Sequence, residues 1–498
     1  MSKIAIIGSG FSGISAAAYL SAAGHQVHVF EKNSQAGGRA RNLKTDSGYI
    51  FDMGPSWYWM PGVFEKFFKD FGFAVADLYE LKLLNPSFDV VFSNNETMSV
   101  PENFDELCKM FDSIESGSSH QLIKFMDEAE YKYKTGIENL VYKPGLSLAE
   151  FADIDLIKGA FRLQVFSSFS KHVRKYFSNP KLIALMEFPV LFLGAMPQDT
   201  PALYSLMNYA GLKLGTWYPI GGFSKVIDAM ILVAEKNGAH FHLNAPVEQI
   251  EIENNRAKNI LVNGESIDFD AVIASADYHH VESKLLKPEY RNYDEKYWEK
   301  KTFAPSCLIF YLGINKKIES LNHHTLFFDE DLFQHSIEIY KQPQWPSKPL
   351  FYACCPSKSE DGVAPKGHEN IFLLMPIAPG LIDSEEMREK YFNIMINRLQ
   401  KQTGQDIMPY IDFKKSYCVN DFIFDYNSYK GNAYGLANTL MQTALLKPKL
   451  KNKKVNNLFY TGQLTVPGPG VPPSIISGKV VADELLKHLK KRNYEAAF

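Results

Sequence analysis

The sequence KIAIIGSGFSG at residues 3–13 decides the fold, because it joins a strand signal to a glycine-rich turn. Residues 3–7 are short, apolar and rich in β-branched side chains, as in a buried parallel strand. The pattern becomes helical over 11–23, and Gly24 stands where a helix C-cap glycine belongs. Residues 26–30 then alternate polar and apolar side chains. The segment therefore predicts one strand–turn–helix–strand unit.

Three glycines in this turn have the spacing G-x-G-x-x-G. Gly8 permits the tight turn, Gly10 lets the backbone approach a pyrophosphate, and Gly13 allows close packing of helix on strand. The N–H groups at a helix N-terminus attract phosphates. Glu31 ends the second predicted strand, where a carboxylate accepts hydrogen bonds from a ribose and repels a 2′-phosphate. We therefore expect a dinucleotide site, and a purely structural glycine turn is the alternative.

Length and composition narrow the class of protein. The chain has 498 residues, 46% hydrophobic and 22% charged, so a large folded core is expected rather than disorder. A net charge of −3 argues against a dedicated nucleic-acid-binding protein. No apolar run is long enough to predict a membrane-spanning helix. The five cysteines are scattered, without a CxxC, and no secretory signal precedes the first strand, so we expect a cytoplasmic protein.

Strand-like segments recur far along the chain, which bears on its domain organisation. Residues 240–252, 258–262, 271–274 and 458–461 have strand patterns, and a helix is predicted at 223–236. By contrast, residues 64–188 read as mostly helical and 278–447 as mixed. The fold class is therefore α/β, with a Rossmann-like domain assembled from discontinuous segments plus an inserted α+β substrate domain.

Two more glycine-rich segments are candidate ligand contacts. Gly37, Gly38 and Arg39 supply backbone amides and a cation close after Glu31. Glycines within 462–473 allow a ligand to approach the backbone, and the prolines there stiffen the loop. A last helix predicted at 475–490 would point its N-terminus at the same cleft. Either segment could instead be an ordinary structural loop.

Several segments together resemble the bacterial carotenoid (phytoene) desaturases, which are FAD-dependent members of the amine oxidase flavoprotein superfamily. They are the opening motif, VHVFEK at 27–32, GGRA at 37–40, FDMGPS at 51–56, YPIGGF at 218–223, NLFYTG at 457–462 and PGPGV at 467–471. These segments lie at both ends and in the middle, so the resemblance spans the whole chain. Gln463, Val466 and Pro469 depart from the family's usual residues, and they bear on substrate and oxidant rather than on fold.

The resemblance implies FAD as the cofactor. It places the backbone at Val247 against adenine and the segment 462–471 along the flavin and ribityl chain. The FAD-binding domain is then expected at 1–80, 215–280 and 450–498, and the substrate-binding, membrane-facing domain at 81–214 and 281–449. The expected cofactor contacts are Gly8, Gly10, Phe11, Ser12, Gly13, Glu31, Lys32, Gly37, Gly38, Arg39, Met53, Gly54, Pro55, Ser56, Val247, Gly462, Gln463, Gly470, Val471 and Pro472.

The resemblance also implies an oxidoreductase of carotenoid biosynthesis that desaturates a C40 precursor, with phytoene as the leading substrate. Side chains cannot accept the hydride that such a reaction removes, whereas a flavin can do so at N5. A polyene has no charge to bind, so a long aromatic and aliphatic tunnel must hold it. Candidate walls are residues 57–59, 161–166 and 188–196. Oxygen or a quinone would reoxidise the flavin.

Other functions stay open at this point. They are desaturation of a later or hydroxylated carotene, isomerisation or saturation of a carotenoid with reduced FAD, amine oxidation by a flavin, and binding of flavin or carotenoid without turnover. The number of double bonds introduced and the oligomeric state are not legible from the sequence. The products distinguish these functions, since each leaves a different change in the substrate.

No catalytic residue or metal site is predicted. Asp52, Glu187, Asp199 and Asp277 have no marking partner, and we interpret them as structural. The histidine pairs at 279–280 and 323–324 are expected not to share a metal, because neighbouring residues of a regular element face different ways.

Two basic stretches, 447–454 and 487–492, have two interpretations. They are either solvated surface or sites attracted to anionic lipid headgroups. A substrate that resides in a bilayer favours the second interpretation. It predicts peripheral membrane association, with contact rather than spanning.

Overall fold

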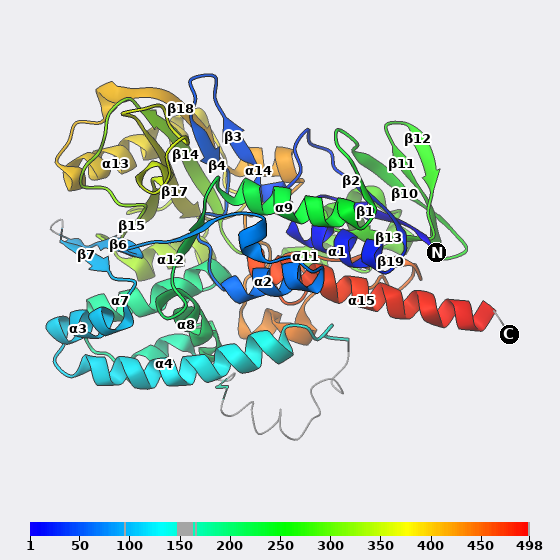
Figure 1. Cartoon of the computed structure of the whole chain (residues 1–498), viewed down its shortest axis with the longest axis horizontal. Coiled ribbons are helices and arrows are strands. Elements are labelled where there is room, and N and C mark those ends of the chain that lie inside the picture. The colour runs from blue at the N-terminus through cyan, green and yellow to red at the C-terminus, as the bar shows by residue number, and fades with distance from the viewer. Residues whose placement is uncertain (94–95, 147–162, 165–166, 497–498) are drawn as a thin grey trace.

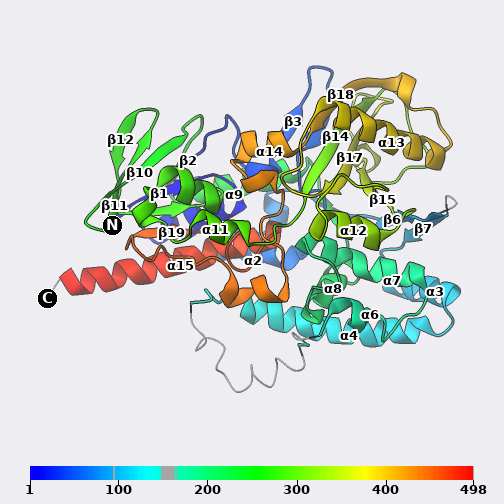
Figure 2. The same cartoon turned by 180° about the vertical axis from the view of Figure 1, so that it is seen from behind.

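The computed structural model describes residues 1–93, 96–146, 163–164 and 167–496. Two lobes lie side by side, each around its own sheet, and the C-terminal helix α15 extends from one of them (Figure 1). The same arrangement is seen from behind in Figure 2.

A five-stranded parallel sheet forms the centre of the first lobe, in the order β19-β13-β1-β2-β9. Apart from Lys3, the side chains of β1 and β13 are buried, as expected for parallel strands covered on both faces. The strands come from the beginning, the middle and the end of the chain, which confirms the predicted discontinuous Rossmann-like assembly. They are β1 (Lys3–Ile7), β2 (Gln26–Phe30), β9 (Ala239–His242), β13 (Ala271–Ala274) and β19 (Leu458–Tyr460).

Helices α1 (Phe11–Ala22), α9 (Phe223–Lys236) and α15 (Val471–Ala496) pack beside this sheet. Helix α1 contacts both of the others. The approach of α15 to α1 is close, because a Cβ built on Gly478 would lie 2.4 Å from the Ser12 carbonyl oxygen. This contact ties the two helix N-termini to the same edge of the sheet.

One long strand predicted over 240–252 is in fact two strands of different sheets. β9 belongs to the parallel sheet, whereas β10 (Val247–Glu253) begins a three-stranded antiparallel sheet with β11 (Arg256–Val262) and β12 (Glu265–Asp268). Asn244, with φ +52°, and Pro246 lie between them and explain the break.

The second lobe is built on a seven-stranded sheet in the order β18-β14-β17-β16-β15-β6-β7. Its pairs are antiparallel except for β6 with β15. Helix α13 (Glu385–Thr403) buries Phe392 and Leu399 among side chains of β14 and β17. The strands are β6 (Phe88–Val91), β7 (Thr97–Val100), β14 (Ser306–Ile314), β15 (His324–Phe327), β16 (Phe351–Cys354), β17 (Glu369–Ile377) and β18 (Ile411–Tyr417).

The region 64–188 is less helical than predicted, because it contains β6, β7 and the short strand β5 (Leu81–Leu83). Apolar runs as short as Phe88–Val91 do not by themselves separate strand from helix. Helices do dominate the rest of its described part. They are α2 (Pro61–Asp70), α3 (Phe104–Ile114), α4 (Ser118–Thr135), α6 (Phe169–Val173) and α7 (Pro180–Glu187), followed by α8 (Leu206–Leu212).

The remaining elements connect the two lobes. β5 (Leu81–Leu83) pairs with β8 (Trp217–Pro219), so a ladder crosses the predicted boundary between them. All strands of the five- and seven-stranded sheets fall on the predicted sides of that boundary, and the division into domains stays a prediction. Short elements complete the described fold: β3 (Asn42–Lys44), β4 (Ile50–Asp52), α10 (Tyr278–His280), α11 (Glu295–Glu299), α12 (Leu332–Tyr340) and α14 (Val419–Tyr426).

Candidate active site

A cavity of about 480 Å³ runs from the parallel sheet to the seven-stranded sheet. One end is lined by Gly8, Glu31 and Ser275, which follow the carboxyl ends of β1, β2 and β13. Ligands of open α/β sheets bind at this edge. The other end is apolar and is lined by residues of α12 and of β14 to β17.

All the cofactor contacts predicted from the sequence line this cavity except Gly13. A Cβ on Gly13 would lie 2.1 Å from the Gly8 carbonyl oxygen. Gly13 therefore lets α1 pack closely on the turn, which is the role that the glycine spacing predicts. For the other residues, contact with a cofactor stays a prediction.

The glycine turn leaves the N-terminus of α1 open. Gly8 has φ +99°, which glycine adopts without strain. Gly10 is the N-cap residue, and no side chain caps the helix there. A Cβ built on Gly10 would meet no atom within 4 Å. Uncapped amides beside open space are what an anionic pyrophosphate requires.

Glu31 is buried and held by two neighbours that the sequence analysis missed. Its Oε2 accepts hydrogen bonds from the Ser9 amide (3.1 Å) and hydroxyl (2.8 Å). Its Oε1 accepts from the Asn33 amide (3.0 Å) and side-chain Nδ2 (2.8 Å). These four donors fill the carboxylate's acceptor sites. A ribose would therefore replace the Ser9 hydroxyl or the Asn33 side chain, and both residues line the cavity.

Arg39 provides a second sign of a missing anionic or carbonyl partner. Its Nη2 donates to the Ser428 hydroxyl and the Asn432 carbonyl, each at 3.2 Å. Its buried Nε has no hydrogen-bond partner among the residues that the structure describes. Burial lowers the pKa of Arg39, and Tyr426 and Asp277 oppose that shift. A half-buried guanidinium whose buried N–H is unpaired beside a cavity fits a bound ligand.

Three features therefore fit FAD at this end of the cavity: the open N-terminus of α1, the fixed carboxylate of Glu31 and the unpaired Nε of Arg39. The sequence analysis missed several residues beside them. The segment 275–277 could have been found, since it follows a strand adjacent to β1. Tyr426, on α14, carries no such signal. The missed lining residues at this end include Ser9, Asn33, Ser275, Ala276, Asp277, His280, Asp425, Tyr426 and Asn427.

The C-terminal loop reaches the cavity as predicted, but the last helix begins earlier than expected. α15 begins at Val471, not at 475. Pro472 and Pro473 lack N–H groups, and the Ser474 amide bonds to the Gly470 carbonyl. The first turn of α15 therefore offers a ligand fewer donors than the first turn of α1.

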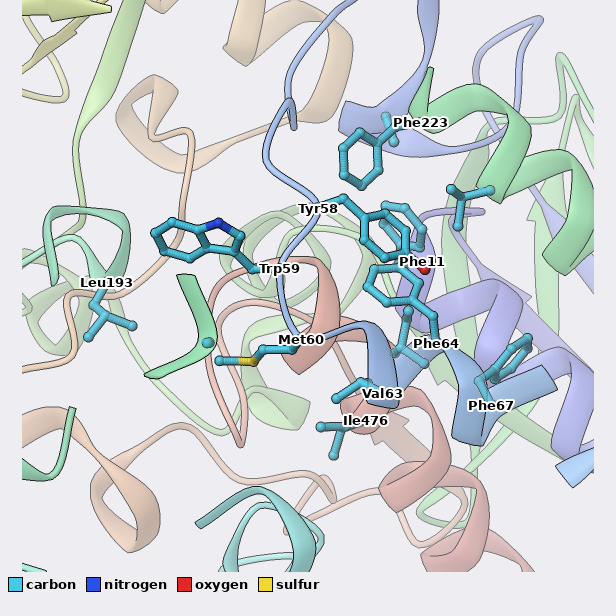
Figure 3. Close-up of a cluster of buried hydrophobic side chains, with 14 of the residues drawn as sticks. Phe11, Tyr58, Trp59, Met60, Val63, Phe64, Phe67, Leu193, Phe223 and Ile476 are labelled. Atoms are coloured by element: carbon cyan, nitrogen blue, oxygen red, sulfur yellow. The ribbon is translucent and has the colours of Figure 1, made fainter. Parts of the chain in front are cut away.

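Aromatic and aliphatic side chains form the other end of the cavity. Trp57 and Trp59 line it, whereas Tyr58 stacks on Phe64 at 4.1 Å between ring centroids. Figure 3 shows Trp59 and Tyr58 on opposite sides of the chain, with Leu193 on the side of Trp59. Of the predicted walls, Trp57, Trp59, Phe188, Leu191 and Leu193 line the cavity. The prediction is wrong for Tyr58, 163–164, 189–190 and 194–196, and 161–162 and 165–166 lie outside the described residues. The apolar lining includes Trp57, Trp59, Met60, Phe188, Leu191, Leu193, Met207, Ile309, Leu326, Phe328, Leu332, Ile339, Leu350, Phe351 and Leu374.

His335 lines the apolar end, but both of its ring nitrogens are occupied. Nε2 pairs with the Pro376 carbonyl at 2.9 Å, and Nδ1 accepts from the Leu350 amide at 3.0 Å. Burial lowers the pKa of His335 to about 4, so the ring is neutral. We therefore do not assign it as a catalytic base.

The carboxylates near the site are held by protein donors. In the cavity lining, Asp277 accepts from the His280 amide at 3.1 Å, and Asp425 pairs with Arg41 at 2.6 Å. Elsewhere, Asp52 accepts from the Phe223 amide (3.0 Å), Glu187 pairs with Arg174, and Asp199 pairs with Lys341 (2.8 Å). These partners agree with the structural interpretation, and no catalytic residue is assigned.

The first basic stretch, residues 447–454, does not expose all of its lysines. Lys447 is buried, its Nζ has no partner among the described residues, and burial lowers its pKa to about 7. The prediction of an exposed cation is wrong at this position, because the side chain packs beside Gly468.

Among the described residues, no helix has both the length and the hydrophobicity needed to cross a membrane.

Comparison with known proteins places these features in context. Residues 11–486 match the family model described as flavin containing amine oxidoreductase. The chain is 39% identical to the carotenoid 3,4-desaturase of Haloarcula japonica, with 98% of each chain covered. It is 29% identical to the zeta-carotene-forming phytoene desaturase of Myxococcus xanthus, with 97% of this chain and 94% of that protein covered. A crystal structure of an oxidoreductase from Methanosarcina mazei has the same fold, with a TM-score of 0.61 at 19% identity and coverage of 97% and 100%.

Proposed function

The chain belongs to the flavin-containing amine oxidoreductase family, and from this membership we propose that it is an FAD-dependent carotenoid desaturase. One observation carries the proposal: a single cavity joins the dinucleotide edge of the parallel sheet to an aromatic and aliphatic end. The first part suits FAD, and the second suits a hydrocarbon with no charge to bind.

When bound, FAD would supply the oxidation, because an isoalloxazine ring can accept a hydride. The amides at the start of α1 would hold the pyrophosphate, and Glu31 would accept hydrogen bonds from the ribose. Arg39 Nε would donate to the anionic or carbonyl group placed beside it. The apolar end would exclude water from the reacting carbon and orient the chain through contacts with Trp57, Trp59 and their neighbours.

The relatives favour a substrate that reacts near its end. The relative at 39% identity is named for carbons 3 and 4, and low numbers denote the end of a carotenoid. We therefore propose that the end of a later carotene reacts at the apolar end of the cavity.

Phytoene is the second candidate, because the relative at 29% identity is a phytoene desaturase. The test is incubation of the FAD-loaded protein with each substrate in liposomes, under air or with a quinone as oxidant. Absorption and mass of the products are measured. We expect a loss of two hydrogens and a red-shifted spectrum with the later carotene. Bound FAD with both carotenoids unchanged would contradict the proposal.

We propose that the protein reaches such substrates by peripheral contact with a membrane. Leu146, Met441 and Leu446 are exposed apolar side chains. Lys449 Nζ donates to the carbonyls of Gly145 and Leu445, each at 3.2 Å, so Leu146 and Leu446 lie on segments joined by one lysine. Exposed apolar side chains beside a cation suit the interface of a bilayer that carries anionic lipids.

A further inference from the structure

Two histidines and a cysteine converge behind the apolar end of the cavity. His324 on β15 is the register partner of Cys354 on β16, and His323 directly precedes β15. One ring nitrogen of each histidine and the Cys354 Sγ lie within 4.8 Å of one another. All three side chains are buried. The prediction that the two histidines diverge assumed a regular strand, whereas the strand begins between them.

The hydrogen bonds leave each ring with one unused nitrogen. His324 Nδ1 lies 2.6 Å from the Tyr352 hydroxyl, which itself donates to the Ser56 hydroxyl at 3.1 Å. In the tautomer whose Nδ1–H donates to Tyr352, Nε2 keeps its lone pair. His323 Nδ1 lies 2.7 Å from the Ser359 hydroxyl. Neither Nε2 has a hydrogen-bond partner among the described residues.

We propose that His323, His324 and Cys354 bind one thiophilic metal ion, Zn²⁺ or Cu⁺. Two imidazoles and a thiolate are ligands that these ions prefer and that Mg²⁺ and Ca²⁺ do not. A hydrogen bond on the second ring nitrogen is the usual companion of a metal-binding histidine. The ion would thereby give a partner to the buried, unpaired Nε2 atoms of His323 and His324.

A small cavity lies beside two of the three side chains. It has about 10 Å³ and is lined by His323 and Cys354 together with Asp52 and Tyr218, but not by His324. Its volume is close to that of one water-sized sphere. The negative charge of the Cys354 thiolate alone would neutralise Cu⁺. The thiolate together with an ionised Asp52 carboxylate would neutralise Zn²⁺. Binding of either ion releases the thiol proton to solvent.

A bound ion would also hold the wall of the large cavity. The His324 ring stacks on Trp57, with 4.1 Å between centroids and 9° between planes. Trp57 and Tyr352 both line the apolar end. The ion would therefore fix the ring that positions Trp57, and this role is independent of which carotenoid enters.

The test measures metal in the FAD-loaded full chain. Elemental analysis of the purified protein identifies any copper or zinc, and protein stripped with a chelator is then titrated with Zn²⁺ against a chromophoric competitor. We expect one ion per chain. Cys354→Ser should weaken Zn²⁺ binding more than about 100-fold, since losing a ligand's hydrogen-bond partner alone costs about 10–100-fold. Cys355→Ser is the matched control, because Cys355 is buried next to it but lies outside the cluster.

Two results would overturn the site: folded wild-type protein that takes up no stoichiometric ion, or full binding retained by Cys354→Ser. Should Cys354→Ser fail to fold, X-ray absorption of the zinc-loaded wild type decides. We expect nitrogen at about 2.0 Å and one sulfur at about 2.3 Å. A coordination shell without sulfur would refute the assignment.

Discussion

The guanidinium of Arg39 lies over the ring of Tyr426, with its Cζ 4.8 Å from the ring centroid. The aromatic face holds one side of the cation, and Ser428 and Asn432 hold Nη2. Nε is left for a ligand, and this makes Arg39 the best single test of how the protein holds FAD.

Arg39→Lys should weaken FAD binding by about 10–100-fold, because a hydrogen bond to a charged group contributes about 1.5–3 kcal/mol and lysine lacks the planar fork. The measurement is the FAD dissociation constant by flavin fluorescence. Arg256→Lys is the control, since Arg256 does not line the cavity. Equal FAD affinity in Arg39→Lys and the wild type would remove this role.

Substitutions at Gly10 and Gly13 should have different effects, one on FAD binding and the other on stability. Gly10→Val should fold, because its φ is −73° and its Cβ meets open space, but it should not retain FAD. Gly13→Ala should destabilise the fold, because its Cβ would lie 2.1 Å from the Gly8 oxygen. Flavin content and thermal unfolding separate the two. A Gly10→Val protein that purifies with full flavin would refute the pyrophosphate site.

Glu31→Ala should also weaken FAD binding, since the ribose loses its acceptor. The loss should be smaller in Glu31→Gln, which keeps one acceptor oxygen. Isothermal titration with FAD measures both variants. If Glu31→Ala bound FAD as tightly as the wild type, the ribose would be held elsewhere.

Lys447 predicts a pH dependence of stability. Its folded pKa of about 7 lies below the ordinary value of 10.5, so between these values the unfolded chain binds more protons. Stability from this group therefore rises as pH rises from 7 to 10.5, by about 1.4 kcal/mol per unit of pKa shift as an upper bound. Lys447→Met should thus raise the melting temperature at pH 7, and the gain should fade towards pH 10.5. Lys453→Met, on an exposed lysine, should show neither effect.

Leu191→Ala should raise the KM for the carotenoid about tenfold, because burying a leucine contributes about 1.5–3 kcal/mol, while FAD content stays unchanged. Leu232→Ala, on an exposed leucine, is the control. Loss of FAD in Leu191→Ala would place this residue at the cofactor instead.

Liposome binding tests the membrane contact. Met441→Glu with Leu446→Glu should reduce co-sedimentation with anionic liposomes, because the apolar contact is lost and repulsion is added. Phe424→Glu, at an exposed phenylalanine on α14, should not. Equal reduction by both changes would point to charge alone.

The sequence predicts those elements that local residue patterns mark. Strands β1, β2 and β13 have their predicted bounds, because glycine signals and apolar runs mark them. The break at 243–246 was missed, because polar and apolar residues continue to alternate across Asn244 and Pro246. β6 and β7 were missed because short apolar runs are ambiguous.

The residues of the candidate site likewise fall into those that a local motif marks and those that only tertiary packing brings together. Motif residues such as Gly10 and Arg39 could be found from their spacing and from the family resemblance. Tyr426, His335 and the cluster of His323, His324 and Cys354 could not, because tertiary packing brings together residues that share no motif. The cysteine that completes the cluster lies on the neighbouring strand, where a sequence pattern gives no distance.

The mass and absorption spectrum of the carotenoid products formed by the FAD-loaded protein test the proposed desaturation most directly. We predict a product two hydrogens lighter, with a longer conjugated system, from a later carotene. Flavin-loaded protein that leaves both this carotene and phytoene unchanged, under air and with quinone, would contradict it.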